Sequence, residues 1–133
     1  MDGKLKHLEF IQDVITRMGR NSFALKGWTV TIIAALFALS FKDPNSLIIW
    51  VGIIPIVLFW YLDAFYLQQE RLYRSLYDKV RQLNEDEIDF SMKASFKEFD
   101  RKENSFFSCV KSKTELSFYG ILSLILIVTI ILF

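Results

Sequence analysis

Three apolar runs of membrane-spanning length dominate this chain of 133 residues. Residues 23–41, 46–67 and 116–133 contain 14, 18 and 14 apolar side chains, respectively. As helices these runs would be about 28, 33 and 27 Å long, which matches a hydrocarbon core of about 30 Å. The sequence therefore predicts an all-α integral membrane protein with three transmembrane helices, and not a soluble domain built around one large core.

The distribution of basic residues around these spans predicts their orientation. Of the 16 lysines and arginines, 15 lie at or before residue 26 or within 68–115, and only Lys42 lies between the first two spans. Basic residues collect on the cytoplasmic side of membrane proteins. We therefore expect the N-terminus and segment 68–115 in the cytoplasm of a bacterial inner membrane. The tight turn predicted at 42–45 and the C-terminal Phe133 would lie at the outer face.

The polar segments beside the spans carry apolar side chains at helical spacing, so they are also expected to be helical. No proline or turn signal separates a segment from its span, which predicts three continuous helices over 4–41, 46–83 and 92–133. Their polar parts, 4–22 and 68–115, would form a cytosolic three-helix bundle, and the whole chain one helical membrane domain. The three apolar stripes are Leu8, Ile11, Ile15 and Met18; Tyr73, Leu76, Val80 and Leu83; and Phe96, Phe99, Phe106 and Val110.

These stripes have two interpretations, which the sequence leaves open. They pack against one another within one chain, which the periodicity favours, or they contact other subunits or a partner protein. A thin bundle has a large surface for its volume, so association of several chains would bury more of it. We therefore expect a homo-oligomer in the lipid bilayer.

Two features inside the spans are candidates for assembly or gating. Pro55 removes the hydrogen bond to the Val51 carbonyl and predicts a kink beside Gly52, which either acts as a gate or is simply accommodated. The first span also carries a ridge of small side chains that permits close approach of another helix, from the same chain or from a second subunit. The ridge consists of Gly27, Thr31, Ala34, Ala35 and Ala38.

Charged residues near the inner ends of the spans form a second group of candidates. Asp63 is flanked on both sides by apolar residues. A carboxylate in such a place usually faces a partner or water, so it would line a polar vestibule or pair with Lys26 or Lys113. The alternative is an exposed residue at the membrane interface. The basic residues expected to ring the inner membrane surface, where anionic lipid attracts each by ~1 kcal/mol, are Arg71, Arg74, Lys111 and Lys113.

Residue counts and motifs argue against several classes of function. The single cysteine, Cys109, and the single histidine, His7, leave little for a metal site or for histidine-based catalysis, and both are expected to be structural. A net charge of +1 gives no general attraction to nucleic acid. No phosphate-binding glycine loop, nucleophile elbow or catalytic carboxylate pair is present. We therefore expect neither an enzyme nor a bound cofactor or metal.

Two stretches of the chain are familiar, NSFALKGWT at 21–29 and LDAFYLQQERLYR at 62–74. Together they resemble small bacterial membrane proteins that accompany anti-phage defence genes, in which a multi-span helical protein is the membrane-disrupting effector of abortive infection. The resemblance covers about residues 8–81. It implies a pore-forming or permeabilising oligomer of the inner membrane that acts when a cytosolic partner or a signal reports infection.

The polar content of the spans is compatible with such an effector. The hydroxyl groups would leave a hydrophobic constriction that stays closed by dewetting until the helices move apart. The alternative is a membrane-anchored scaffold or accessory subunit that docks a cytosolic partner through its helical stalk. The hydroxyl groups in the spans belong to Thr29, Thr31, Ser40, Ser117, Ser123 and Thr129.

Overall fold

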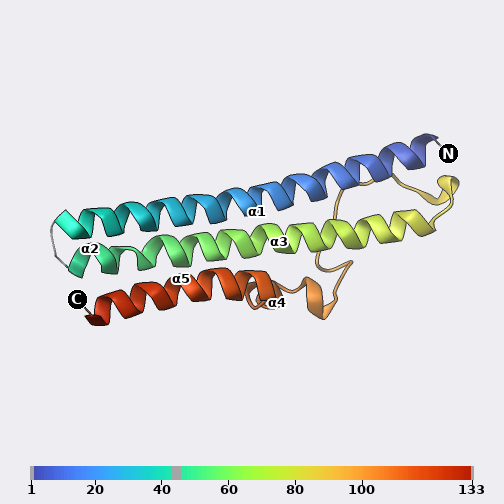
Figure 1. Ribbon diagram of the computed structural model, residues 1–133. Helices are drawn as coiled ribbons and strands as arrows, with labels where there is room; N and C mark the ends of the chain where they lie inside the picture. The colour runs from blue at the N-terminus through green and yellow to red at the C-terminus, as the bar shows by residue number, and fades with distance from the viewer. Residues whose placement is uncertain (1, 43–45, 133) are drawn as a thin grey trace.

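The computed structural model describes residues 2–42 and 46–132, and within these ranges the chain is helical without any strand. Three long helices lie side by side (Figure 1). Two 3-10 turns and a short helix are found in the segment that joins the second to the third. The elements are α1 (Asp2–Lys42), α2 (Ser46–Val51), α3 (Ile53–Gln82), η1 (Glu85–Glu87), η2 (Lys102–Asn104), α4 (Phe106–Val110) and α5 (Lys113–Leu132).

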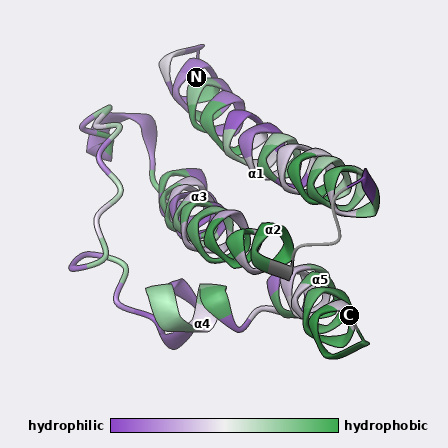
Figure 2. Cartoon of the chain, turned by 90° about the vertical axis from the view of Figure 1, so that its left-hand side faces the viewer, coloured by the Kyte–Doolittle hydropathy of each residue, from purple (hydrophilic) through white to green (hydrophobic). Residues whose placement is uncertain are grey.

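Three of the helical segments are long and apolar enough to cross a membrane: Asp2–Lys42, Leu47–Gln82 and Lys113–Leu132. This confirms the three apolar helices expected from the sequence. Figure 2 shows the hydrophobic colouring on α2, on α5 and at the C-terminal end of α1, whereas the N-terminal end of α1 is hydrophilic. The turn predicted at 42–45 and Phe133 fall largely or wholly outside the described residues.

α1 and α3 run antiparallel and continue past their apolar parts as a polar stalk, formed by residues 2–22 and 68–82 (Figure 1). The first two predicted stripes meet inside this stalk, which confirms their packing within one chain. They form an apolar core with Ile88 and Phe99 from the following segment. The buried members of this core are Ile11, Ile15, Leu72, Leu76, Val80, Ile88 and Phe99.

The predicted third helix over 92–133 is wrong, because α5 begins only at Lys113. The stalk is therefore a helical pair covered by an irregular segment, and not a three-helix bundle. A turn at 96–99 begins at Ser95, whose Oγ accepts the Glu98 amide at 3.3 Å. It does not continue as a helix: the Phe99 carbonyl accepts the Arg101 amide at 2.8 Å and the Asn104 side-chain amide at 3.0 Å, and neither is the amide four residues later that an α-helix would use.

Two serines then start new helices. Ser105 caps α4 by accepting the Ser108 amide at 3.1 Å, and Ser112 caps α5 by accepting the Glu115 amide at 3.3 Å. N-cap residues have non-helical backbone angles, so each of these serines interrupts a continuous helix. The irregular segment is also tied to α1, where His7 Nε2 donates to the Ser91 carbonyl at 3.1 Å. This contact gives His7 the structural role expected for it.

The second span is interrupted at Gly52, between α2 and α3, as the position of Pro55 three residues later predicts. The Gly52 amide bonds to the Ile49 carbonyl at 2.9 Å, one residue short of the α-helical spacing. Gly52 also lies close to side chains of α1 and α5. A Cβ atom there would stand 3.2 Å from Leu126 Cδ1 and 3.3 Å from Ile33 Cδ1. The interruption thus permits close packing of α1, α2 and α5.

This packing makes Gly52 sensitive to side-chain size. We expect Gly52→Val to lower the stability of the protein by about 1 to 3 kcal/mol, the usual effect of overpacking a filled interior. Gly120→Val is the matched control, because a Cβ at Gly120 meets nothing within 4 Å. Thermal unfolding in one detergent, followed by circular dichroism, measures both. Equal losses in the two variants would show that the close approach at Gly52 does not exist.

Candidate functional site

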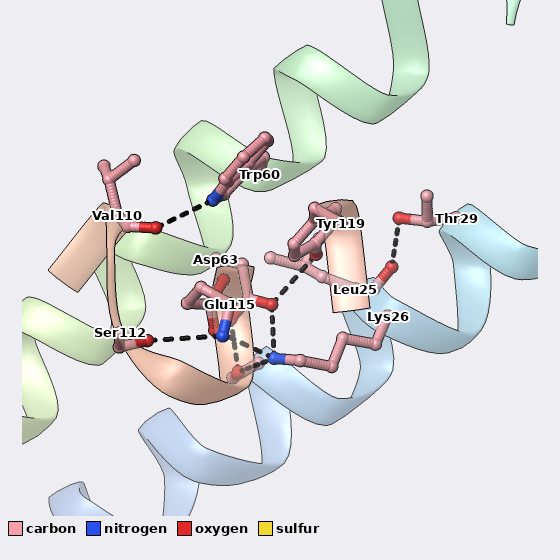
Figure 3. Close-up of polar contacts among 10 residues, drawn as sticks. Leu25, Lys26, Thr29, Trp60, Asp63, Val110, Ser112, Glu115 and Tyr119 are labelled. Carbon is pink, nitrogen blue, oxygen red and sulfur yellow. Dashed lines mark hydrogen bonds and ion pairs between the residues drawn. The ribbon is translucent and has the colours of Figure 1, made fainter. Parts of the chain in front are cut away.

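A cluster of buried charges joins the three long helices (Figure 3). Lys26 comes from α1, Asp63 from α3 and Glu115 from the first turn of α5. Lys26 Nζ lies 2.5 Å from Asp63 Oδ2 and 3.0 Å from Glu115 Oε1. Asp63 is 0% exposed and Glu115 1%, whereas the Lys26 side chain retains 15%. One ammonium group thus bridges two carboxylates taken from different helices.

Asp63 is the best-satisfied member of this charge cluster. Ser22 Oγ donates to Asp63 Oδ1, and the Tyr119 hydroxyl donates to Asp63 Oδ2 at 2.9 Å. With Lys26, the carboxylate therefore accepts three hydrogen bonds, and both of its oxygens have a partner. Such bonds offset the cost of burying an ionised carboxylate.

Glu115 is less well satisfied. Its Oε1 accepts a hydrogen bond from Lys26, but its Oε2 is buried and has no hydrogen-bond partner among the described residues. Lys26 also donates to Ser22 Oγ at 3.0 Å, so its ammonium group is shared among three acceptors. The charge cluster is therefore asymmetric, with most donors directed at Asp63.

Simple helical spacing brings these side chains together. On α1, Ser22, Lys26 and Thr29 follow one another at intervals of four and three residues, so they share the face that meets α3. On α5, Glu115 and Tyr119 are four residues apart and also share a face. Thr29 does not join the charge cluster, because its hydroxyl donates to the Leu25 carbonyl of its own helix at 2.7 Å.

Aromatic rings close the side of the charge cluster next to α4. The Trp60 ring stacks on Tyr119 with their centroids 5.7 Å apart and their planes 9° apart. Trp60 Nε1 also donates to the Val110 carbonyl at 3.2 Å (Figure 3). The Trp60 contacts attach α4 and α5 to α3. The rings also cover the charges with apolar surface, and the interaction between the charges is stronger there because the local dielectric constant is low.

The structure decides between the interpretations of Asp63 that the sequence left open. Its expected pair with Lys26 is formed, whereas Lys113 is exposed. An exposed position at the membrane interface is wrong, because Asp63 is completely buried. The sequence reasoning missed Glu115 and Tyr119. The sequence does contain one sign of this site, because the acidic Glu115 stands directly before the third apolar run and one helical turn before Tyr119.

The ridge of small residues on α1 does not pack against the second span. All of its members, including Gly27, Thr31 and Ala35, are exposed, and a Cβ at Gly27 would meet nothing within 4 Å. Helical spacing puts the buried Leu25 and Ile33 on the other side of α1, toward α3. Packing within the same chain is therefore excluded as an explanation for this face.

The four basic residues expected at the inner surface have different surroundings. Arg71 donates to the Glu103 carbonyl at 2.6 Å and contacts Cys109 Sγ at 3.7 Å, so it holds the irregular segment. Arg74 pairs with Glu70 at 2.9 Å. Lys111 Nζ lies 4.2 Å above the Phe107 ring, and Lys113 is exposed. Only the two lysines, with the exposed Arg74, remain available as a surface group.

Cys109 behaves as a structural residue. It is buried, and this burial raises the pKa of its thiol, while the neighbouring Arg71 acts in the opposite direction. A protonated thiol is a poor nucleophile. Among the described residues, no group of three or more histidine, cysteine, aspartate or glutamate side chains is placed to hold a metal ion.

Comparison of the chain with protein-family models, curated proteins and solved structures finds no match.

The role of Lys26 in this cluster is testable by substitution. We expect Lys26→Met to lower the stability by about 3 to 5 kcal/mol, because it leaves two buried carboxylates without a cation. Lys113→Met, which removes an exposed lysine, should have almost no effect. Adding Asp63→Asn to Lys26→Met should recover part of the loss by removing one uncompensated charge. Unfolding in detergent, followed by tryptophan fluorescence, gives these values. Additive losses in the double variant would contradict a direct interaction between the two side chains.

Proposed function

We propose that this protein is a non-enzymatic effector of anti-phage defence in the bacterial inner membrane, which oligomerises and permeabilises the membrane when a partner or signal triggers it. The observation that carries the proposal is the uncovered ridge of small side chains on an apolar helix. The resemblance of segments 21–29 and 62–74 to abortive-infection effectors supplies the functional class.

The ridge supports assembly through α1. Gly27, Thr31 and Ala35 are exposed on the side of α1 away from α3. Between helices in lipid, van der Waals packing drives association, and small residues allow the backbones to approach closely. A second copy placed there would cover this ridge, which the single chain leaves uncovered.

The hydroxyl groups of the apolar segments support a closed resting state. Each of four such groups donates to a carbonyl of its own helix, one turn earlier, so its single donor is already used. Permeabilisation would then require the helices to move or new chains to join, which suits an effector that is inactive until triggered. The four donors are Thr29, Thr31, Ser40 and Thr129.

The proposed orientation places the polar stalk in the cytoplasm. The uneven distribution of basic residues, 15 against 1, supports it. In this orientation the charge cluster lies near the inner membrane surface, where the stalk begins. Exposed Leu5 and Phe10 on the stalk favour contact with a cytosolic protein. They are the observation behind a second candidate function, a scaffold that docks such a partner without disrupting the membrane.

Dye leakage from liposomes that contain the purified protein tests the proposed function. High protein density should replace the trigger by driving assembly through mass action. We therefore expect the wild type to release dye at a high protein-to-lipid ratio, and to depolarise cells and arrest their growth when it is overexpressed. Gly27→Leu should reduce both leakage and chemically cross-linked oligomers several-fold, because a large side chain keeps the helices apart. Val30→Leu is the matched control, since Val30 is exposed on the same helix beside the ridge.

One result would contradict the effector function, and another would contradict the role of the ridge. Inert liposomes and undisturbed cells, together with a co-purifying cytosolic protein, would favour the scaffold. Equal losses of leakage in Gly27→Leu and Val30→Leu would leave membrane disruption in place but remove the ridge as its assembly surface.

A further inference from the structure

The charge cluster of Lys26, Asp63 and Glu115 carries one negative charge too many if all three groups are ionised. Both carboxylates are buried and only one ammonium group reaches them. An unbalanced charge in such a place is costly, and buried groups commonly take up or lose a proton to avoid it.

The surroundings of the charge cluster provide no second cation among the described residues. α1 contributes Lys26, α3 contributes Asp63, and α5 contributes the neutral Tyr119 beside Glu115. The nearest titratable group of α4 is the buried thiol of Cys109. Arg71 is directed at that thiol and at a backbone carbonyl. Lys111 and Lys113 are exposed, and Lys111 lies over the Phe107 ring. The charge must therefore be balanced by something that the chain binds.

We propose that the charge cluster is a proton-binding site, with one proton held on Glu115. Asp63 accepts hydrogen bonds from Ser22, Lys26 and Tyr119, so both of its oxygens have donors. Glu115 accepts one, from Lys26, and its buried Oε2 has no hydrogen-bond partner in the part of the chain that the structure describes. When one oxygen of a buried carboxyl group has no hydrogen-bond partner, burial costs less free energy if the group is neutral than if it is an anion.

The position of Glu115 in its helix favours the ionised carboxylate instead. Glu115 lies in the first turn of α5, and the N-terminus of a helix stabilises a negative charge. Within the described ranges, however, the Glu115 side chain accepts a hydrogen bond from Lys26 alone, and its own backbone amide donates to Ser112 Oγ. The dipole of α5 therefore opposes the proton without providing the hydrogen bonds that a buried anion needs.

Loss of this proton would loosen α5. Two ionised carboxylates, one on α3 and one on α5, would then repel each other across a single ammonium group. This repulsion would weaken two contacts of α5, that of Glu115 with Lys26 and that of Tyr119 with Asp63. Lys26 is partly exposed, so the cluster is open to proton exchange. This inference does not depend on the proposed effector function.

Infrared spectroscopy of the protein in lipid bilayers tests the proton site. At neutral pH we expect the carbonyl band of a protonated carboxylic acid, which disappears as the pH is raised. Glu115→Gln should abolish the band. Glu98→Gln should keep it, because the Glu98 carboxylate is exposed and paired with Lys79. The thermal midpoint of the wild type should fall as the pH rises from the range in which an ordinary glutamate loses its proton to the range in which the band disappears, because the folded protein then holds a proton that the unfolded chain has lost. The midpoint of Glu115→Gln should not.

Labelling makes the test independent of the variants. If Glu115→Gln does not fold, wild-type protein made with 13C-carboxyl glutamate should show the band shifted to lower frequency. A band that does not shift, or that persists in a folded Glu115→Gln, would overturn the assignment to Glu115. Absence of any protonated band would overturn the proton site. Stabilisation by sodium at constant pH and ionic strength would also overturn it, in favour of an alkali cation as the balancing charge.

Discussion

The pairing of one lysine with two buried carboxylates is the constraint on which the arrangement of the three long helices depends. Lys26, Asp63 and Glu115 each come from a different helix, and each is buried or nearly so. A slip of one residue along any helix would turn its side chain by about 100° and break the contact. Since an unpaired buried charge is strongly destabilising, the cluster sets both the register and the rotation of the helices.

Two apolar cores, one on each side of the charge cluster, bury the apolar surface of the helices. Toward the stalk, α1 and α3 share a core that includes Ile11 and Leu76. Toward the other end, Ile33, Ile56 and Leu126 form a second core around the break at Gly52. α5 takes part only in the second core, so its attachment depends more on the charge cluster than that of α1 or α3 does. It is the element whose movement a change in that cluster affects most.

The sequence predicted the spans and the two longest helices because hydrophobic length and periodicity are local properties. It also named Lys26 as one of two possible partners of Asp63, since a carboxylate inside an apolar stretch usually faces a partner or water, but it left a position at the membrane interface open. It did not predict Glu115, which lies at the end of a span and has no local sign of burial. The prediction of a third helix from residue 92 was wrong. Phe96 and Phe99 have helical spacing, which is a local pattern. Asn104 acts through hydrogen bonds to Phe99 and Ser75, and these contacts cannot be read from the local sequence.

The account depends on the charge cluster being intact in a lipid bilayer. Solid-state NMR of the labelled protein in bilayers measures this directly, through the proximity of the Lys26 ammonium nitrogen to carboxyl carbons. We expect through-space correlations from Lys26 Nζ to both the Asp63 and the Glu115 carboxyl carbons, which come from α3 and α5. A Lys26 nitrogen that shows neither correlation and exchanges freely with water would contradict the arrangement of all three helices described here.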